Sequence, residues 1–314
     1  MRAFGGATIG TTWAVKAVLP ATTDLAALQA MVQRALDAVV AEMSPGRRCR
    51  ISVATTAAPP EARTALPPAT ATVLRRAIAV AEASDGAFDP TLGRSPTCGA
   101  SALFHFRVSR RWRPISPPCA PPAAGSALTL DGDALFQPGG LKLDLNGIAK
   151  GFGVDRGRRR PRSGRRQELS GRGRRRAARR WAPSRDGQPW WVELERPPLQ
   201  GLAANDAEKT VVALHDLAVA TSGDYRRFFE HDGRRYAHTL DPATGAPSAN
   251  PTVSVTVLAR DCMSADAWAT ALTVMPPDAA LAFAADHGLA ALIVSRGASG
   301  VEERLSPALQ AMLD

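Results

Sequence analysis

The segment Leu143-Asp-Leu-Asn-Gly-Ile-Ala-Lys-Gly-Phe-Gly-Val-Asp155 is the most informative stretch of this chain of 314 residues. Residues 141–145 predict a strand, Asn146-Gly147 predicts a turn, and a helix is expected from near Ile148. Small residues let backbone N–H groups approach a phosphate at the start of such a helix, and Lys150 adds positive charge there. The pattern is neither a Walker loop nor a dinucleotide fingerprint, so a plain strand–turn–helix joint with a solvated lysine stays open.

Helices and hairpins on either side of this segment predict an α+β fold. Apolar residues recur at helical spacing over residues 24–43, 69–83, 264–275 and 277–287. Strand patterns cover residues 10–18, 190–194, 209–219, 252–259 and 290–295. Asp232-Gly233, a favoured turn pair, predicts a hairpin between two further arms. Long helices mixed with hairpins are typical of α+β rather than of strictly alternating α/β folds.

Asp266 and Thr270 are candidate metal ligands. They stand four residues apart on an expected helix and therefore share one face. Both offer oxygen, which a hard cation such as Mg²⁺ prefers. One carboxylate and one hydroxyl would need a backbone carbonyl, water and a substrate phosphate to complete the site. The alternative is an acid that favours the helix dipole beside an ordinary buried threonine.

Two further polar residues stand next to turns. His238 precedes Asp241-Pro-Ala-Thr-Gly245, where it could act as a base near neutral pH or be structural. In Phe88-Asp89-Pro90, the carboxylate could be presented from a loop or could cap the preceding helix.

The positive charge of the chain is concentrated in residues 156–185. Arginine fills 14 of these 30 positions and Glu168 is the only acid, so the block carries +13 and the rest of the chain, whose total is +10, carries −3. The block could be a nucleic-acid-binding arm or a solvated insertion, but its only aromatic residue is Trp181, near its end, so aromatic residues do not alternate with the arginines. The block consists mainly of Arg, Gly, Ala, Pro and Ser, which are the residues that GC-rich codons encode when they are read out of frame. We favour the hypothesis that a frame slip in the gene produced this block.

Residues 45–66 and 94–127 also lose periodicity and become rich in Ala, Pro and Arg. Both begin and end abruptly beside well-patterned sequence, as the arginine-rich block does. Three compensated frame slips in the gene would account for all three segments. The four cysteines, Cys49, Cys98, Cys119 and Cys262, have neither metal-ligand spacing nor the pattern of a disulfide framework.

Six motifs in this order resemble the ApbE family, the FAD:protein FMN transferases. They are GTTWAVK from Gly10, AFDPTLG from Ala87, DLNGIAKGFGVD from Asp144, ATSGDYRRFF from Ala220, YAHTLDPATG from Tyr236 and SADAWATAL from Ser264. Each motif is weak alone, but the ordered set spans nearly the whole chain apart from the three irregular segments. The resemblance implies a single ApbE-like domain over residues 1–314.

The resemblance also implies a reaction and a set of site residues. Family members use FAD with Mg²⁺ and transfer FMN to a Thr or Ser hydroxyl of a target flavoprotein with release of AMP, and some hydrolyse FAD instead. By similarity the metal ligands would be the Gly147 carbonyl, Asp266 and Thr270. The flavin nucleotide site would be lined by Ala87, Phe88, Asp89, Asp144 and Lys150, with Ile9 and Leu240 at its edges. His238 would take the proton from the target hydroxyl.

Further expectations concern rival functions, the cellular compartment and the target protein. The rivals to a transferase are a non-catalytic flavin-nucleotide-binding protein from a damaged gene and, more distantly, an arginine-rich nucleic-acid binder; we expect no nucleic acid. The N-terminus lacks a charged region followed by an apolar one, which predicts either a cytoplasmic protein or a misplaced start. Members of the family are often periplasmic or anchored to the inner membrane. Family targets are often membrane-associated subunits of respiratory complexes.

Overall fold

The computed structural model describes most of the chain outside the irregular segments. The described residues are 1–8, 11–17, 19–43, 62–92, 128–136, 143–158, 170–173, 176–179, 189–197, 210–214, 216–225, 228–231, 234–297 and 300–313. Among them, no helix is both long and apolar enough to cross a bilayer.

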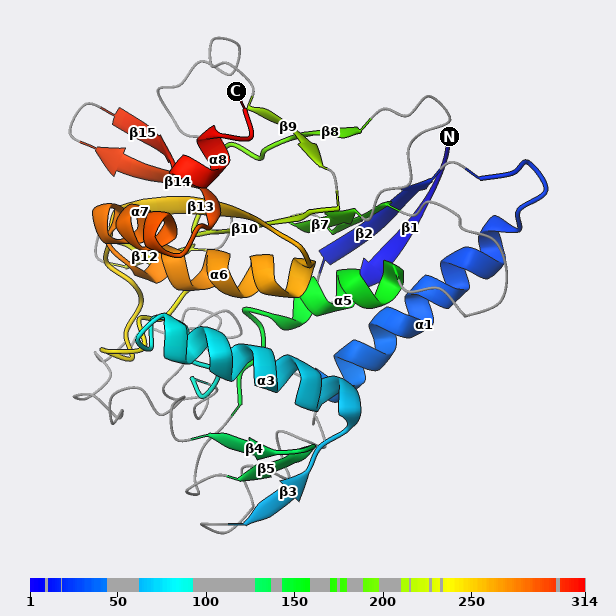
Figure 1. Cartoon of the computed structure of the whole chain (residues 1–314), viewed down its shortest axis with the longest axis horizontal. Coiled ribbons are helices and arrows are strands. Elements are labelled where there is room, and N and C mark those ends of the chain that lie inside the picture. The colour runs from blue at the N-terminus through cyan, green and yellow to red at the C-terminus, as the bar shows by residue number, and fades with distance from the viewer. Residues whose placement is uncertain are drawn as a thin grey trace.

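An antiparallel sheet forms the centre of the described structure (Figure 1). Its strand order is β1 (Arg2–Thr8), β2 (Thr11–Ala17), β6 (Ser170–Gly173), β7 (Arg176–Arg179), β10 (Ala218–Gly223), β13 (Thr252–Ala259), β14 (Ala290–Gly297) and β15 (Gly300–Leu305). Every neighbouring pair in this order is antiparallel. Three smaller sheets join β3 (Arg63–Ala65), β5 (Ala134–Phe136) and β4 (Thr129–Asp131); β8 (Trp190–Glu193) and β9 (Val211–Leu214); and β11 (Phe228–His231) and β12 (Arg234–Ala237).

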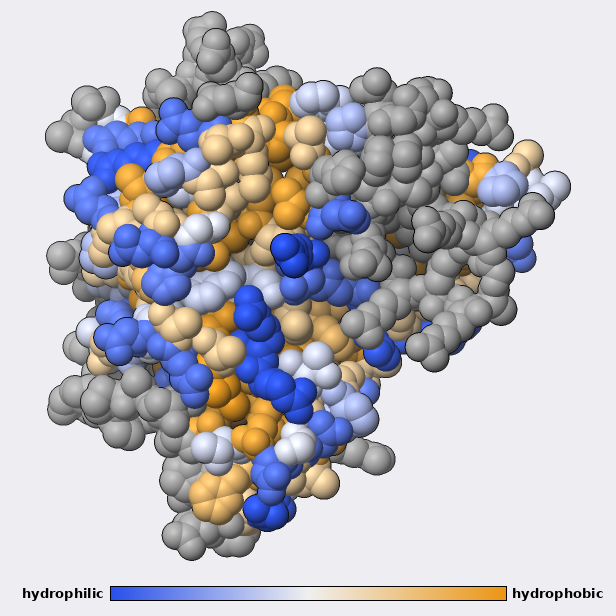
Figure 2. All heavy atoms as spheres, viewed as in Figure 1, coloured by the Kyte–Doolittle hydropathy of each residue, from blue (hydrophilic) through white to orange (hydrophobic). Residues whose placement is uncertain are grey.

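Helices pack on one face of the large sheet (Figure 1). They are α1 (Leu25–Met43), α3 (Pro68–Ala83), α5 (Ala149–Arg158), α6 (Cys262–Val274) and α7 (Pro277–Asp286); a short α8 (Pro307–Gln310) follows β15. Helix α6 lies against β10 and β13, and α3 packs on α6. Figure 2 shows the surface in the same view, where hydrophilic and hydrophobic side chains are intermingled.

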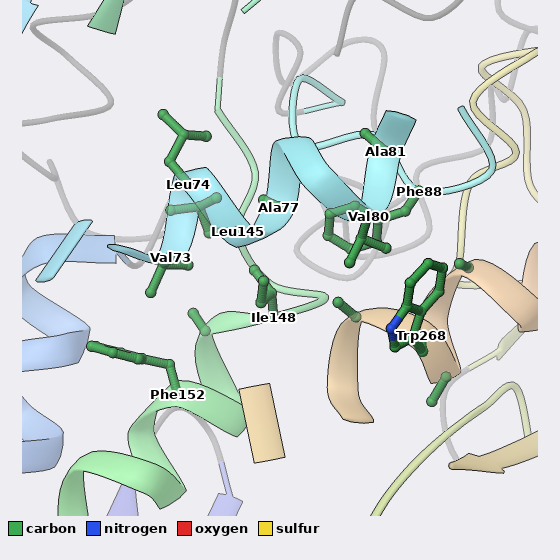
Figure 3. Close-up of a cluster of buried hydrophobic side chains, with 14 of the residues drawn as sticks. Val73, Leu74, Ala77, Val80, Ala81, Phe88, Leu145, Ile148, Phe152 and Trp268 are labelled. Atoms are coloured by element: carbon green, nitrogen blue, oxygen red, sulfur yellow. The ribbon is translucent and has the colours of Figure 1, made fainter. Parts of the chain in front are cut away.

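The sheet separates two hydrophobic cores, because alternate residues of a strand point to opposite faces. Val255 and Val257 of β13 pack with α3, α5 and α6, whereas Leu258 joins the cluster with β8, β9 and α8. Figure 3 shows the first core, in which Val80 and Phe88 lie with Ile148 and Trp268. β13 is therefore buried along almost its whole length.

Most of the expected elements are confirmed, with bounds shifted by a few residues. The helices expected at 24–43, 69–83, 264–275 and 277–287 are α1, α3, α6 and α7, and the predicted hairpin is β11–β12. Asp24 caps α1 by accepting a hydrogen bond from the backbone N–H of Ala27 (3.0 Å).

Two strand predictions are wrong. Leu143 to Leu145 form no strand; instead the N–H of Asp144 donates to the carbonyl of Pro90 (2.7 Å), which ties the segment to a loop. The strand expected at 209–219 is divided at Asp216, which has a φ of 52°. A left-handed residue turns the chain, and β9 and β10 therefore belong to different sheets.

Part of the arginine-rich block is built into the large sheet. β6 pairs with β2, and β7 pairs with β10, so the hairpin β6–β7 lies between these strands. These eight residues of the block are therefore paired strands of the large sheet. Residues 45–61, 93–127 and the remainder of the block after α5 lie outside the described residues.

Helices α5 and α6 cap one another through two carboxylates. Asp155 of α5 accepts hydrogen bonds from the backbone N–H groups of Cys262 (3.1 Å) and Met263 (2.9 Å), at the start of α6. Asp266 of α6 accepts one from the N–H of Gly151 (2.8 Å), in the first turn of α5. First-turn N–H groups have no acceptor within their own helix, and negative charge is favourable there. We call this arrangement the reciprocal cap.

The reciprocal cap requires close contact between the helices at Gly151. A Cβ atom on Gly151 would lie 2.8 Å from the Cβ of Asp266 and closer still to the carbonyl oxygen of Cys262. Even the smallest side chain would therefore force α5 and α6 apart.

Gly151→Ala is expected to lower the free energy of unfolding by about 3 kcal/mol, at the upper end of overpacking costs. Gly157→Ala is the matched control in the same helix, because its Cβ would make an ordinary 3.5 Å contact with Val32. That change should be neutral or stabilising by up to ~1 kcal/mol, since alanine is the better helix former. Denaturant unfolding measures both; equal stability of the two variants would contradict the account.

Candidate active site

Oxygen atoms from two motifs meet where the turn before α5 faces α6. The hydroxyl of Thr270 lies 3.3 Å from the carbonyl oxygen of Gly147 and 3.0 Å from the carbonyl oxygen of Asp266. These contacts place Gly147, Asp266 and Thr270, the three residues expected to bind metal, in one cluster, which we call the oxygen cluster.

The carboxylate of Asp266 is fully buried, with 0% of the residue exposed. Burying a charge is costly unless it is paired or hydrogen-bonded. The N–H of Gly151 supplies one such bond to Oδ2, at the positive end of α5. Asp266 thus belongs to both the reciprocal cap and the oxygen cluster.

The oxygen cluster fits a hard divalent cation. It offers a hydroxyl and two backbone carbonyls, and the Asp266 carboxylate lies one helical turn from Thr270 on the same helix. Oxygen atoms of these kinds are the donors that Mg²⁺ prefers. Among the described residues there is no group of three or more His, Cys, Asp or Glu side chains that could hold a metal ion.

The turn at Gly147 is closed on one side by Phe88. A Cβ atom on Gly147 would lie 2.9 Å from the ring of Phe88 and 3.1 Å from the methyl group of Thr270, so a glycine is needed at this position. The hydrogen bond from Asp144 to Pro90 joins this turn to the loop that carries Ala87, Phe88 and Asp89.

That loop is held by its own hydrogen bonds. The N–H of Phe88 donates to the hydroxyl of Ser84 (3.1 Å), and the N–H of Ala87 donates to the Ser84 carbonyl (3.1 Å). Asp89 accepts bonds from the N–H and the hydroxyl of Thr91 (2.7 and 2.6 Å). It therefore stabilises its own turn, and the alternative in which it caps α3 is wrong.

Asp144 and Lys150 lie on either side of the turn. Oδ1 of Asp144 accepts from the N–H of Asn146 (2.8 Å), and Nζ of Lys150 donates to the Asn146 carbonyl (3.0 Å). Burial raises the pKa of Asp144 above its usual value of 3.8, although the Asn146 N–H and the charge of Lys150 act in the opposite direction. Neutralising this carboxylate, or placing a cation near it, would therefore relieve an electrostatic cost.

The remaining expected residues lie on other segments. His238 and Leu240 follow β12, and a bridge between Leu240 and Pro247 closes the turn that begins after His238. The hydrogen bonds that join the oxygen cluster do not include these two residues. Ile9 lies outside the described residues.

Three polar residues with structural roles at the site were not predicted from the sequence. Asp155 caps the start of α6. Asn250 donates to the carbonyls at the other end of this helix, including that of Val274 at 2.6 Å. Ser222, in β10, contacts the Thr270 hydroxyl at 3.2 Å. Ser222 lies within a quoted motif, but spacing alone gave no sign that it faces α6.

Comparisons with known proteins identify the family of this chain. The ApbE family model matches residues 9–293. A FAD:protein FMN transferase from Vibrio cholerae is 33% identical over 324 residues, covering 98% of this chain and 91% of that protein. The apo structure of the Pseudomonas stutzeri flavinyl transferase ApbE superposes with a TM-score of 0.82 at 29% identity, covering 99% of this chain and 96% of that chain. The flavin transferase ApbE from Vibrio cholerae gives 0.78 at 30% identity, covering 99% of both.

The resemblance read from the six motifs and the predicted α+β class are both confirmed by these matches. The matched range includes every residue of the oxygen cluster. This chain belongs to the ApbE family.

Proposed function

We propose that this protein is an Mg²⁺-dependent FAD:protein FMN transferase. The observation that carries the proposal is the meeting of Gly147, Asp266 and Thr270 in one oxygen cluster beside the loop of Phe88. The names of the relatives, which are FAD:protein FMN transferases, support the choice of substrate.

The proposed reaction transfers a phosphoryl group. A Thr or Ser hydroxyl oxygen of a target flavoprotein attacks the phosphorus of the FMN half of FAD. The bond from this phosphorus to the bridging oxygen breaks, the hydroxyl loses its proton, and AMP leaves with the bridging oxygen. Catalysis of such a transfer is mainly positioning and charge neutralisation. We infer that targets include membrane-associated subunits of respiratory complexes.

The chain supplies a positive environment for the pyrophosphate. When bound to the oxygen cluster, Mg²⁺ supplies charge neutralisation for the phosphate oxygens. The N-terminal end of α5 and the Lys150 ammonium group add fixed positive charge beside the cluster. The loop of Ala87, Phe88 and Asp89, tied to Asp144, lines the adjoining part of the nucleotide site.

His238 is proposed to accept the proton of the target hydroxyl. Histidine is the side chain most often used as a general base, because it changes charge near neutral pH. His238 lies between β12 and the closed turn that contains Asp241 and Gly245, so the backbone on both sides of it is held by strand pairing and turn hydrogen bonds. The N–H of Gly245 donates to the Asp241 carbonyl (2.7 Å), and the φ of Gly245 is 66°, which favours glycine there.

Asp266→Asn is expected to lower AMP release from FAD at least about 100-fold, because losing a metal ligand removes several kcal/mol of transition-state stabilisation. Asp278→Asn is the control: this carboxylate is 92% exposed on α7 and should not matter. Chromatographic measurement of AMP compares the two variants. Wild-type AMP release from the Asp266 variant would contradict the metal site.

His238→Gln is expected to slow FMN transfer to the acceptor protein about 100-fold or more while FAD binding is kept, as for loss of a general base. His287→Gln is the control, because His287 is exposed after α7 and stacks on Phe283. In-gel fluorescence of the flavinylated acceptor gives the rate. An unchanged rate in the His238 variant would assign the proton transfer to another group.

Asp144→Asn is expected to stabilise the unliganded protein at neutral pH. The folded pKa of Asp144 is raised, so its contribution to stability is present below 3.8 and is lost as pH rises through the folded value. The gain in Tm of the variant should therefore shrink as the pH falls toward 3.8. Thermal unfolding over a pH series tests this, and a variant less stable than wild type at neutral pH would refute it.

A further inference from the structure

Ser222 touches the proposed cation site through Thr270. Its hydroxyl oxygen lies 3.2 Å from that of Thr270, and Ser222 is half-buried where β10 faces α6. The Thr270 hydroxyl therefore has three polar neighbours, because the carbonyl oxygens of Asp266 and Gly147 lie at 3.0 and 3.3 Å.

The number of hydroxyl protons determines which group is the donor in each of these hydrogen bonds. A threonine hydroxyl has one proton and two lone pairs, and a backbone carbonyl only accepts. If Thr270 donated to Ser222 instead, two carbonyl oxygens would face the Thr270 oxygen with no proton between them. The proton of Thr270 is therefore best directed to a carbonyl, that of Asp266 being nearer. Ser222 must then donate to Thr270, which occupies one of the two lone pairs. The other lone pair is left for a cation.

We propose that Ser222 is a positioning residue that prepares the Thr270 hydroxyl to bind the divalent cation. The proposal rests on the cation site proposed above. With Ser222 as donor, the Thr270 hydroxyl accepts a hydrogen bond from β10 and donates one within its own helix, and these two bonds favour a single orientation of the hydroxyl. It also leaves the Gly147 carbonyl available as a ligand, because the Thr270 proton has Asp266 as its partner.

The neighbouring Thr221 provides a matched control. Its hydroxyl pairs with that of Thr256 across β10 and β13 at 2.8 Å, and this pair is buried. Adjacent strand residues point to opposite faces, so Thr221 points away from α6. Thr221→Val removes a hydroxyl from the same strand without touching Thr270.

The test is calorimetric titration of the whole protein with Mn²⁺ alone, together with the Mg²⁺ dependence of AMP release. Ser222→Ala should weaken Mn²⁺ binding about tenfold or more, as loss of an outer partner of a metal ligand does. Saturating Mg²⁺ should restore most of kcat, because the ligands themselves remain. Thr221→Val should bind Mn²⁺ like wild type, and Ser222→Thr, which keeps a hydroxyl, should regain affinity.

The Asp266→Asn variant distinguishes a failure of the Ser222 proposal from a failure of the cation site itself. If it abolishes Mn²⁺ binding and Ser222→Ala binds as wild type, the role of Ser222 is refuted and the cation site stands. If both variants bind Mn²⁺ as wild type, the cation site itself is refuted. If Ser222→Ala does not fold, Ser222→Cys takes its place, because its thiol is a much weaker donor of similar size. Undiminished Mn²⁺ affinity in Ser222→Cys would likewise overturn the proposal.

Discussion

The reciprocal cap between α5 and α6 is the interaction on which the site depends. Asp155 and Asp266 each give a carboxylate to the first turn of the other helix, at the point where Gly151 allows the closest approach. The same contact brings the turn at Gly147 against Thr270. The caps are charge-assisted and largely shielded, so they contribute more than exposed ion pairs such as Arg63 with Asp131. The carboxylate of Asp266 thus takes part both in the packing of the two helices and in the proposed chemistry.

The arginine-rich block does not contain the oxygen cluster. Its described strands, β6 and β7, complete the large sheet between β2 and β10, whereas the proposed ligands come from Gly147 and α6. The transferase proposal therefore does not depend on how the block arose, and the frame-slip hypothesis stays a prediction. With this block set aside, the charge of the chain gives no argument for a nucleic-acid partner.

The sequence predicted best those helices and strands in which the spacing of apolar residues determines the structure. β13 alternates between two cores, and α6 combines a run of apolar residues with a cap at Asp261. The prediction failed at 143–145, because the bond from Asp144 to Pro90 is made by the backbone and leaves no mark on residue pattern. The proposed ligands were found through motifs. Ser222 and Asp155 were missed because their partners are distant in sequence, a pairing that only the folded chain reveals.

The most direct test of the central claim is a crystal structure of the protein soaked in Mn²⁺, with anomalous data collected at the manganese edge. We expect one anomalous peak in the oxygen cluster, about 2.1 Å from the Gly147 carbonyl, the Asp266 carboxylate and the Thr270 hydroxyl, as for octahedral hard-cation sites. The helices α5 and α6 should keep the reciprocal cap around it. A peak at another place, with the cluster empty, would contradict the account.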